Sequence, residues 1–147
     1  MSEAYMITIY RRNGKLFVSP AVGSTLGFEN LPGVIAVGGR EELVPALEAA
    51  HAQVEAAWRR PKAERFPEGP EYFLAAGAAS WTDFLRGTVA VSVRYGTKDT
   101  KITVLLPDPN RKWLEAADKP PSTTYPVDLP LADAASLALK LLDEIPG

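Results

Sequence analysis

The sequence runs twice through the same order of predicted elements: a β-hairpin, a long loop that ends in a short strand, and an amphipathic helix. The first copy spans residues 5–60 and the second residues 80–147, and Leu47 and Leu137 hold equivalent places in the two helices. A chain built from two β-β-β-α repeats has few ways to bury both helices. The repetition therefore predicts an α+β fold, with one largely antiparallel sheet covered by the helices.

The two hairpins carry the clearest local patterns. In the first, Asn13-Gly14 separates strands predicted over residues 5–12 and 15–19, and this pair suits the positive φ angles of a type I′ turn. In the second, residues 88–95 alternate between apolar and polar side chains, which is typical of a half-buried strand. Both hairpins thus predict antiparallel strand pairs.

An amphipathic helix closes each copy. In the first helix the apolar residues recur at helical spacing, at Leu43, Leu47, Val54 and Trp58. The second helix is predicted over residues 131–144. The segments 20–33 and 107–122 are rich in Pro, Gly and polar residues and are predicted as long loops.

Between the copies lies a predicted linker over residues 61–79, whose first part is dense in proline and charge. After it, Ser80 and Asp83 have the spacing of a capping box, which predicts a short helix that ends at Gly87. A length of 147 residues fits one compact domain. We therefore expect residues 1–147 to form a single domain with an internal duplication.

Composition excludes several kinds of function. The chain has no cysteine and one histidine, so thiol nucleophiles, disulfides, cysteine zinc sites and paired-histidine metal sites are absent. With 16 basic and 18 acidic residues it has no basic arm, and nucleic acid is a poor candidate ligand. No cofactor and no metal ion is predicted.

The sequence also argues against a membrane location. Arg11 and Arg12 fall where a signal peptide needs its apolar stretch, and no run of 18 apolar residues exists. We therefore expect a soluble, cytoplasmic protein.

His51 is the first candidate for chemistry. It lies beside the apolar stripe of its helix, which favours a core or rim position. Catalysis would need a nearby acid, and that helix offers Glu48 and Glu55. Gly38-Gly39 sits between a strand and a helix but lacks the rest of any phosphate-loop pattern.

The loops and the linker hold the candidates for partner binding. Tryptophan near a Pro-rich loop is either a core residue or an interface anchor, and acids in such segments are either solvated charges or an acidic face for a basic partner. The predicted contact residues are Trp113, Glu115, Asp118, Glu64, Glu68 and Glu71.

The segment Ser80–Gly87, followed at once by the strand over residues 88–95, resembles the "SW..F..G" segment of immunity proteins from contact-dependent growth inhibition systems. The opening hairpin, with its Asn13-Gly14 turn and the run Phe17–Pro20, is similar to the start of the same family. The late strand and the Leu/Ala-rich C-terminal helix agree as well.

The resemblance implies a small cytoplasmic inhibitor with no reaction of its own. It would bind, one to one, the C-terminal toxin domain of a secreted effector. Many toxins of such systems are nucleases with basic grooves, which acidic loops with an aromatic anchor would fit. Two alternatives stay open from the residues: a secretion chaperone for an effector, and a small hydrolase that works through carboxylates alone.

Overall fold

The computed structural model of the protein describes residues 4–24, 27–31, 34–61, 79–107, 114–117 and 122–145. The strands are β1 (Tyr5–Arg12), β2 (Lys15–Ser24), β3 (Gly27–Asn30), β4 (Ile35–Val37), β5 (Thr88–Tyr95), β6 (Asp99–Pro107), β7 (Leu114–Ala116) and β8 (Thr123–Pro126). The helices are α1 (Leu43–Trp58), which follows the 3₁₀ turn η1 (Arg40–Glu42), α3 (Trp81–Leu85) and α4 (Leu131–Glu144).

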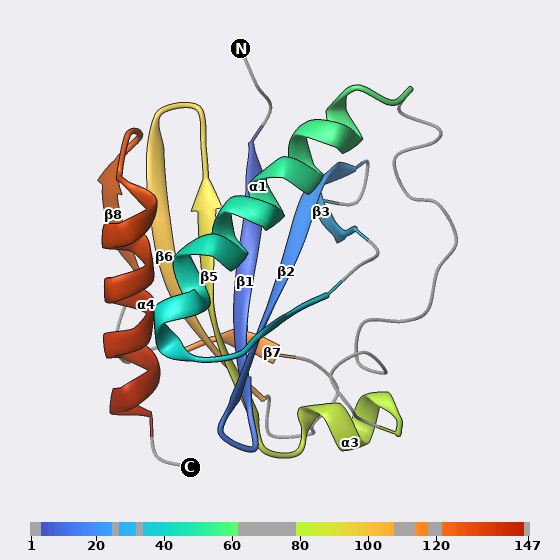
Figure 1. Ribbon diagram of the computed structural model, residues 1–147, viewed down its shortest axis with the longest axis vertical. Helices are drawn as coiled ribbons and strands as arrows, with labels where there is room; N and C mark the ends of the chain where they lie inside the picture. The colour runs from blue at the N-terminus through green and yellow to red at the C-terminus, as the bar shows by residue number, and fades with distance from the viewer. Residues whose placement is uncertain are drawn as a thin grey trace.

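All strands belong to one antiparallel sheet (Figure 1). Six of them follow one another in the order β3-β2-β1-β5-β6-β7, while β4 pairs with β2 and β8 pairs with β6. The first strands of the two predicted copies, β1 and β5, are neighbours at the centre of the sheet. The predicted α+β class, with an antiparallel sheet covered by helices, is confirmed.

The turn between β1 and β2 has the predicted geometry. Asn13 and Gly14 have φ angles of 53° and 75°, the left-handed pair that a type I′ turn requires. This turn sets the register of the hairpin, in which Ile9 lies opposite Val18. Because side chains alternate along a strand, the register also fixes which residues of both strands face the helices.

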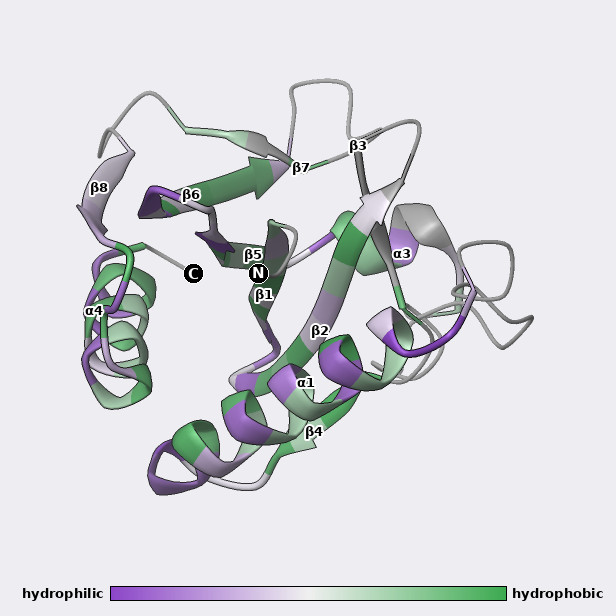
Figure 2. Ribbon diagram, turned by 90° about the horizontal axis from the view of Figure 1, so that it is seen from above, coloured by the Kyte–Doolittle hydropathy of each residue, from purple (hydrophilic) through white to green (hydrophobic). Residues whose placement is uncertain are grey.

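Helices α1 and α4 cover the same face of the sheet (Figure 2). Their apolar sides pack on alternate residues of the central strands, and the most deeply buried members include Ile7, Ile9, Val18, Leu47, Val91, Ala138 and Leu142. We call this the helix face. It holds the larger hydrophobic core of the described chain.

A smaller cluster lies on the other side of the sheet, which we call the opposite face. Phe84 and Leu85 of α3 are fully buried there, against Tyr10, Phe17 and Ala90 from the strands. Tyr10 follows Ile9 in β1, so the alternation of one strand supplies both cores.

The cap of α3 differs from a standard capping box in one contact. The Ser80 hydroxyl accepts the backbone N–H of Asp83 at 3.1 Å, as predicted. The Asp83 carboxylate accepts the backbone N–H of Ala79 at 2.9 Å, and this hydrogen bond holds the pKa of Asp83 below its usual value. Gly87 ends the segment with a φ angle of 77°.

The loop predicted over residues 20–33 is shorter than expected. Strand β2 continues through Pro20 to Ser24 and pairs with β3. Proline is tolerated there because its carbonyl accepts the Leu31 N–H at 2.9 Å on the side away from β1. The missing N–H would point to that same side, so no hydrogen bond between β1 and β2 is lost. The second predicted loop likewise contains a short strand, β7.

Apart from its two ends, the predicted 61–79 linker lies outside the described residues. The internal duplication stays a prediction, although each hairpin is followed along the chain by short strands and a helix of the same layer. Among the described helices, none combines the length and the apolar character that a membrane crossing requires.

Candidate functional site

Most of the predicted contact residues fall outside the described part of the chain: Glu64, Glu68, Glu71, Trp113 and Asp118. Glu115 lies in β7, where its backbone is in register with Leu106 of β6. The acidic contact surface therefore stays a prediction. The geometry that the structure does describe points to different residues.

Two consecutive arginines of β1 hold helices on the two faces of the sheet. Arg12 is buried on the opposite face, where its Nη1 donates to the backbone carbonyls of Asp83 at 2.7 Å and Arg86 at 2.9 Å. Its Nη2 lies 3.2 Å from the Asp83 carboxylate. One guanidinium thus donates to carbonyls of the last turn of α3 and of the turn that follows it.

Arg11 does the same on the helix face. Its guanidinium donates to the carbonyl of Leu142 and, at 3.1 Å, to that of Ile145, at the C-terminal end of α4. Cations are favoured at this end by the helix dipole. In the sequence, a charged residue within an otherwise apolar strand is the feature that could have predicted this role, because a buried guanidinium group requires several hydrogen-bond acceptors. Sequence reasoning used both arginines only to exclude a signal peptide.

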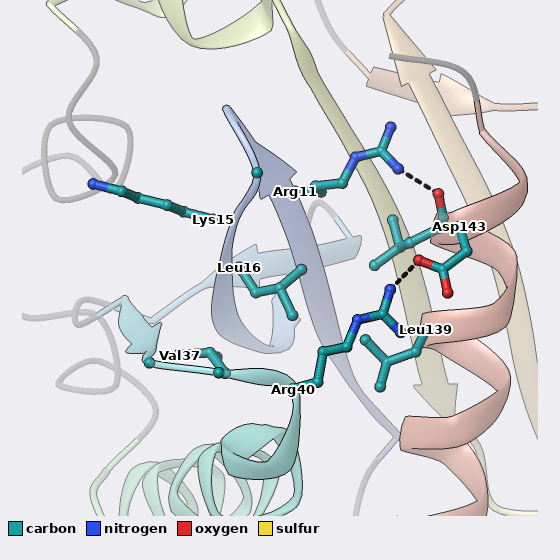
Figure 3. A pocket seen from close by; sticks show the side chains of 11 residues that line it. Arg11, Lys15, Leu16, Val37, Arg40, Leu139 and Asp143 are labelled. Atoms are coloured by element: carbon teal, nitrogen blue, oxygen red, sulfur yellow. Dashed lines mark hydrogen bonds and ion pairs between the residues drawn. The ribbon is translucent and has the colours of Figure 1, made fainter.

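A pocket of about 260 Å³ opens beside Arg11, between the β1–β2 hairpin, η1 and the last turn of α4. We call it the hairpin pocket. Figure 3 shows the Arg11 and Arg40 side chains pointing toward this last turn, while Lys15 lies on the far side of the hairpin and extends away from it. Apolar side chains complete the lining: Leu16, Val37, Leu139 and Leu142.

Arg40 and Asp143 form an ion pair across the hairpin pocket. Both side chains are more than half exposed, at 58% and 52%. Ion pairs with this exposure contribute about 0–1 kcal/mol to stability. The pair therefore adds little to the fold and can separate at small cost.

At the rim of this pocket, two carboxylates of the chain itself lie against the Gly38-Gly39 turn. The Gly38 N–H donates to the Glu42 carboxylate at 3.1 Å, and a side chain at Gly39 would collide with the Glu41 carboxylate. The Gly38 N–H is therefore not free to bind a phosphate group.

His51 is part of an aromatic cluster at the other end of the helix face. The Tyr5 hydroxyl lies 2.7 Å from His51 Nδ1, and the Tyr5 ring stacks on Tyr95 with a centroid distance of 4.8 Å. The rings of His51 and Trp58 meet these tyrosines edge-on. The predicted core or rim position of His51 is confirmed.

Burial controls the ionisation of this cluster. It lowers the pKa of His51, against a smaller opposite effect of Glu55, and raises the pKa of Tyr5 to about 12. The neutral imidazole is therefore the favoured form. Its Nε2 is buried and has no hydrogen-bond partner among the described residues. These features suit packing better than proton transfer to a substrate.

Among the described residues, no three acidic or histidine side chains gather closely enough to hold a metal ion. The described lining of the hairpin pocket contains no serine, threonine, tyrosine or histidine, and in the aromatic cluster the Tyr5 hydroxyl and His51 Nδ1 bind each other. The described side chains therefore provide charge and apolar surface, which proteins use to recognise their partners.

No protein-family model and no curated protein matches the sequence. The fold is nevertheless similar to solved structures over nearly the whole chain. A protein of unknown function from Neisseria meningitidis is 13% identical and covers 96% of this chain and 95% of its own, with a TM-score of 0.60.

A second similar structure is a chain of a CdiA-CT/CdiI toxin and immunity complex from Yersinia pseudotuberculosis. It is 8% identical and covers 95% of this chain and 97% of its own, with a TM-score of 0.57. At such identities the likeness concerns the fold. This chain therefore shares its fold, over nearly its full length, with a chain of a toxin and immunity complex.

Proposed function

We propose that this chain is an immunity protein that binds and neutralises the C-terminal toxin domain of a contact-dependent growth inhibition effector. The observation that carries the proposal is the shared fold with a chain of a toxin and immunity complex, which extends over almost the entire length of both chains. The resemblance of Ser80–Gly87 to the immunity family agrees with it.

The Ser80–Gly87 segment has a structural role in this chain. Ser80 and Asp83 cap α3, and Gly87 supplies the left-handed turn into β5. A segment of this kind supports membership of a fold family and leaves the contact residues open. In the proposal the protein acts in the cytoplasm by binding alone, one to one, and catalyses no reaction.

The experiment is co-expression of this chain with the C-terminal domain of any large secreted protein that is encoded directly upstream. Growth rescue and co-purification of a one-to-one complex are expected. The control pairs the same toxin domain with an immunity protein from another system, which should give neither. A toxic domain that is neither bound nor neutralised by this chain would contradict the proposal.

The folding state of the toxin that this chain binds distinguishes an inhibitor from a secretion chaperone. An immunity protein should bind the purified, folded toxin domain and stop its activity. A chaperone should bind only the unfolded client. Surface plasmon resonance with folded toxin, measured before and after denaturation of the toxin, distinguishes the two.

We further propose that the acidic loop residues face a basic surface of the toxin. Reversing the charge of Glu115 and Asp118 together should slow association and flatten its salt dependence, because steering between opposite charges is lost. The matched control reverses Glu48 and Asp133, which are exposed acids on α1 and α4. Equal association rates for the two double variants at low salt would remove Glu115 and Asp118 as contacts.

A further inference from the structure

We propose that the hairpin pocket receives an acidic side chain of a protein partner, with the adjacent apolar residue of that partner seated on the leucine and valine side chains of the pocket. The inference takes the identity of the partner, the toxin domain, from the proposed function. The chemistry of the recognised segment comes from the pocket itself.

The size of the pocket favours a side chain over a cofactor. Its volume of about 260 Å³ is below the roughly 300–1,000 Å³ of typical small-molecule sites. One carboxylate-bearing side chain and part of an apolar neighbour fit this space.

The charge of the pocket favours an anion. Two guanidinium groups, Arg11 and Arg40, and one carboxylate, Asp143, face the pocket and have a summed formal charge of +1, with Glu41 and Glu42 at the rim, while the whole chain has a charge of −2. The acceptors of Arg11 are carbonyls, which carry no formal charge. The pocket thus presents two guanidinium groups, which can each bind a carboxylate, on an acidic protein.

Asp143 shows how an external carboxylate can be held. Its carboxylate meets the guanidinium of Arg40 at the pocket, where both groups are exposed to solvent. A partner carboxylate that arrives with apolar surface makes the same contact and also covers the side chains of Leu16 and Leu139. Asp143 is therefore an internal competitor that a partner displaces.

The same surroundings favour a carboxylate over a phosphate. The Gly38 N–H is taken by the Glu42 carboxylate, so this amide is not free to cradle phosphate oxygens. A doubly charged phosphate would also meet the negative charges of Glu41 and Glu42 at the rim. A single carboxylate on an apolar stem meets less repulsion and uses the apolar lining.

The first test needs no toxin. The peptides acetyl-Leu-Glu-amide and acetyl-Leu-Gln-amide are titrated into the full chain labelled with ¹⁵N, and amide shifts are followed at Gly38, Gly39 and Arg40. The glutamate peptide should give saturable shifts that Arg40→Ala abolishes. The glutamine peptide should give none. Equal shifts with both peptides, or none with either, overturn the proposal.

The second test uses the purified toxin domain and two variants with opposite expected effects. Arg40→Ala should weaken binding about tenfold, because a charge-assisted contact is lost. Asp143→Asn should tighten binding about threefold, because the internal competitor is removed while the shape of the side chain is kept.

The matched control is Arg94→Ala on β5. Arg94 is an exposed arginine, 44% accessible, that lies 4.0 Å from Asp99, and it is remote from the hairpin pocket. Its removal should leave the affinity unchanged. Weakening by Asp143→Asn, or equal affinities of Arg40→Ala and Arg94→Ala, overturns the proposal. If the unmodified chain does not bind the toxin at all, the proposed function fails, and the peptide titration still decides the chemistry of the pocket.

Discussion

The two faces of the sheet are built from the same strands in different ways. The helix face carries long helices on aliphatic residues such as Ile7, Ile9 and Val91. The opposite face carries the five-residue α3 on a few aromatic and small residues, and its buried strand positions include Thr8 and Ser19. Apolar burial dominates the first face, whereas the second depends more on polar contacts. This difference can be tested with pairs of matched variants.

The largest difference is expected from two fully buried leucines. Leu47→Ala on the helix face should lower the free energy of unfolding by about 4 kcal/mol, and Leu85→Ala in α3 by about 2.5 kcal/mol. The reason is that a short helix can move to fill a cavity more easily than the α1–sheet interface can. Urea unfolding of both variants checks this order. An equal or larger loss for Leu85→Ala would contradict the contrast between the faces.

Arginine contacts should show the reverse order. Arg12→Ala on the opposite face should cost about 2–3 kcal/mol, because it removes hydrogen bonds to three carbonyls around the end of α3 and the ion pair with Asp83. Arg11→Ala, which frees carbonyls at the more exposed end of α4, should cost about 1 kcal/mol. Hydrogen exchange should locate the first loss in α3 and the second in the last turn of α4. A smaller loss for Arg12→Ala than for Arg11→Ala would show that the opposite face does not depend on its polar contacts.

Two fully buried threonines give a finer comparison, because valine keeps their shape. The Thr88 hydroxyl donates to the Phe84 carbonyl on the opposite face, and Thr88→Val should cost about 1 kcal/mol. The Thr100 hydroxyl has no partner among the described residues, and Thr100→Val should leave stability equal or slightly higher. Thermal unfolding of both variants measures the difference. Similar losses for both would mean that shape, and not the hydrogen bond, decides.

His51 makes the helix face sensitive to mild acid. Its pKa is lowered by burial, so the folded state binds this proton less readily than the unfolded state does. The stability from neutral His51 is fully present above the unfolded value of about 6.5 and is lost as the pH falls from there to the lowered folded value. His51→Gln should reduce this loss. Tm measured from pH 7.5 to 5.5 for both proteins checks it, and identical slopes would exclude His51 as the cause.

Much of the fold could be predicted from local patterns. Asn13-Gly14, the alternation of residues 88–95 and the spacing of Leu43 and Leu47 each describe one element, and hydrogen bonds between near neighbours make such elements. The continuation of β2 through Pro20 could not be predicted in this way. Whether β2 can continue through Pro20 depends on which neighbouring strand the missing N–H would face. That side is set by the pairing with β3 and by the hydrogen bond from Leu31.

The candidate site was harder to predict than the fold. Its guanidinium groups lie on β1 and on η1, and its carboxylate is on α4, more than a hundred residues from Arg40. No periodic pattern in the sequence relates residues that lie so far apart along the chain. The predicted acidic contacts, by comparison, came from runs of loop charge, which composition alone makes visible.

By itself, the sequence determined most of the elements of this protein, its α+β class and the kinds of chemistry open to it, because periodicity, turn residues and the lack of cysteine are local or compositional properties. Only the tertiary structure decided that Arg11 and Arg12 hold different helices and that Arg11, Arg40 and Asp143 line one pocket. The physical reason is that alternation along β1 sends neighbouring side chains to opposite faces, and what each side chain meets there depends on how distant segments pack.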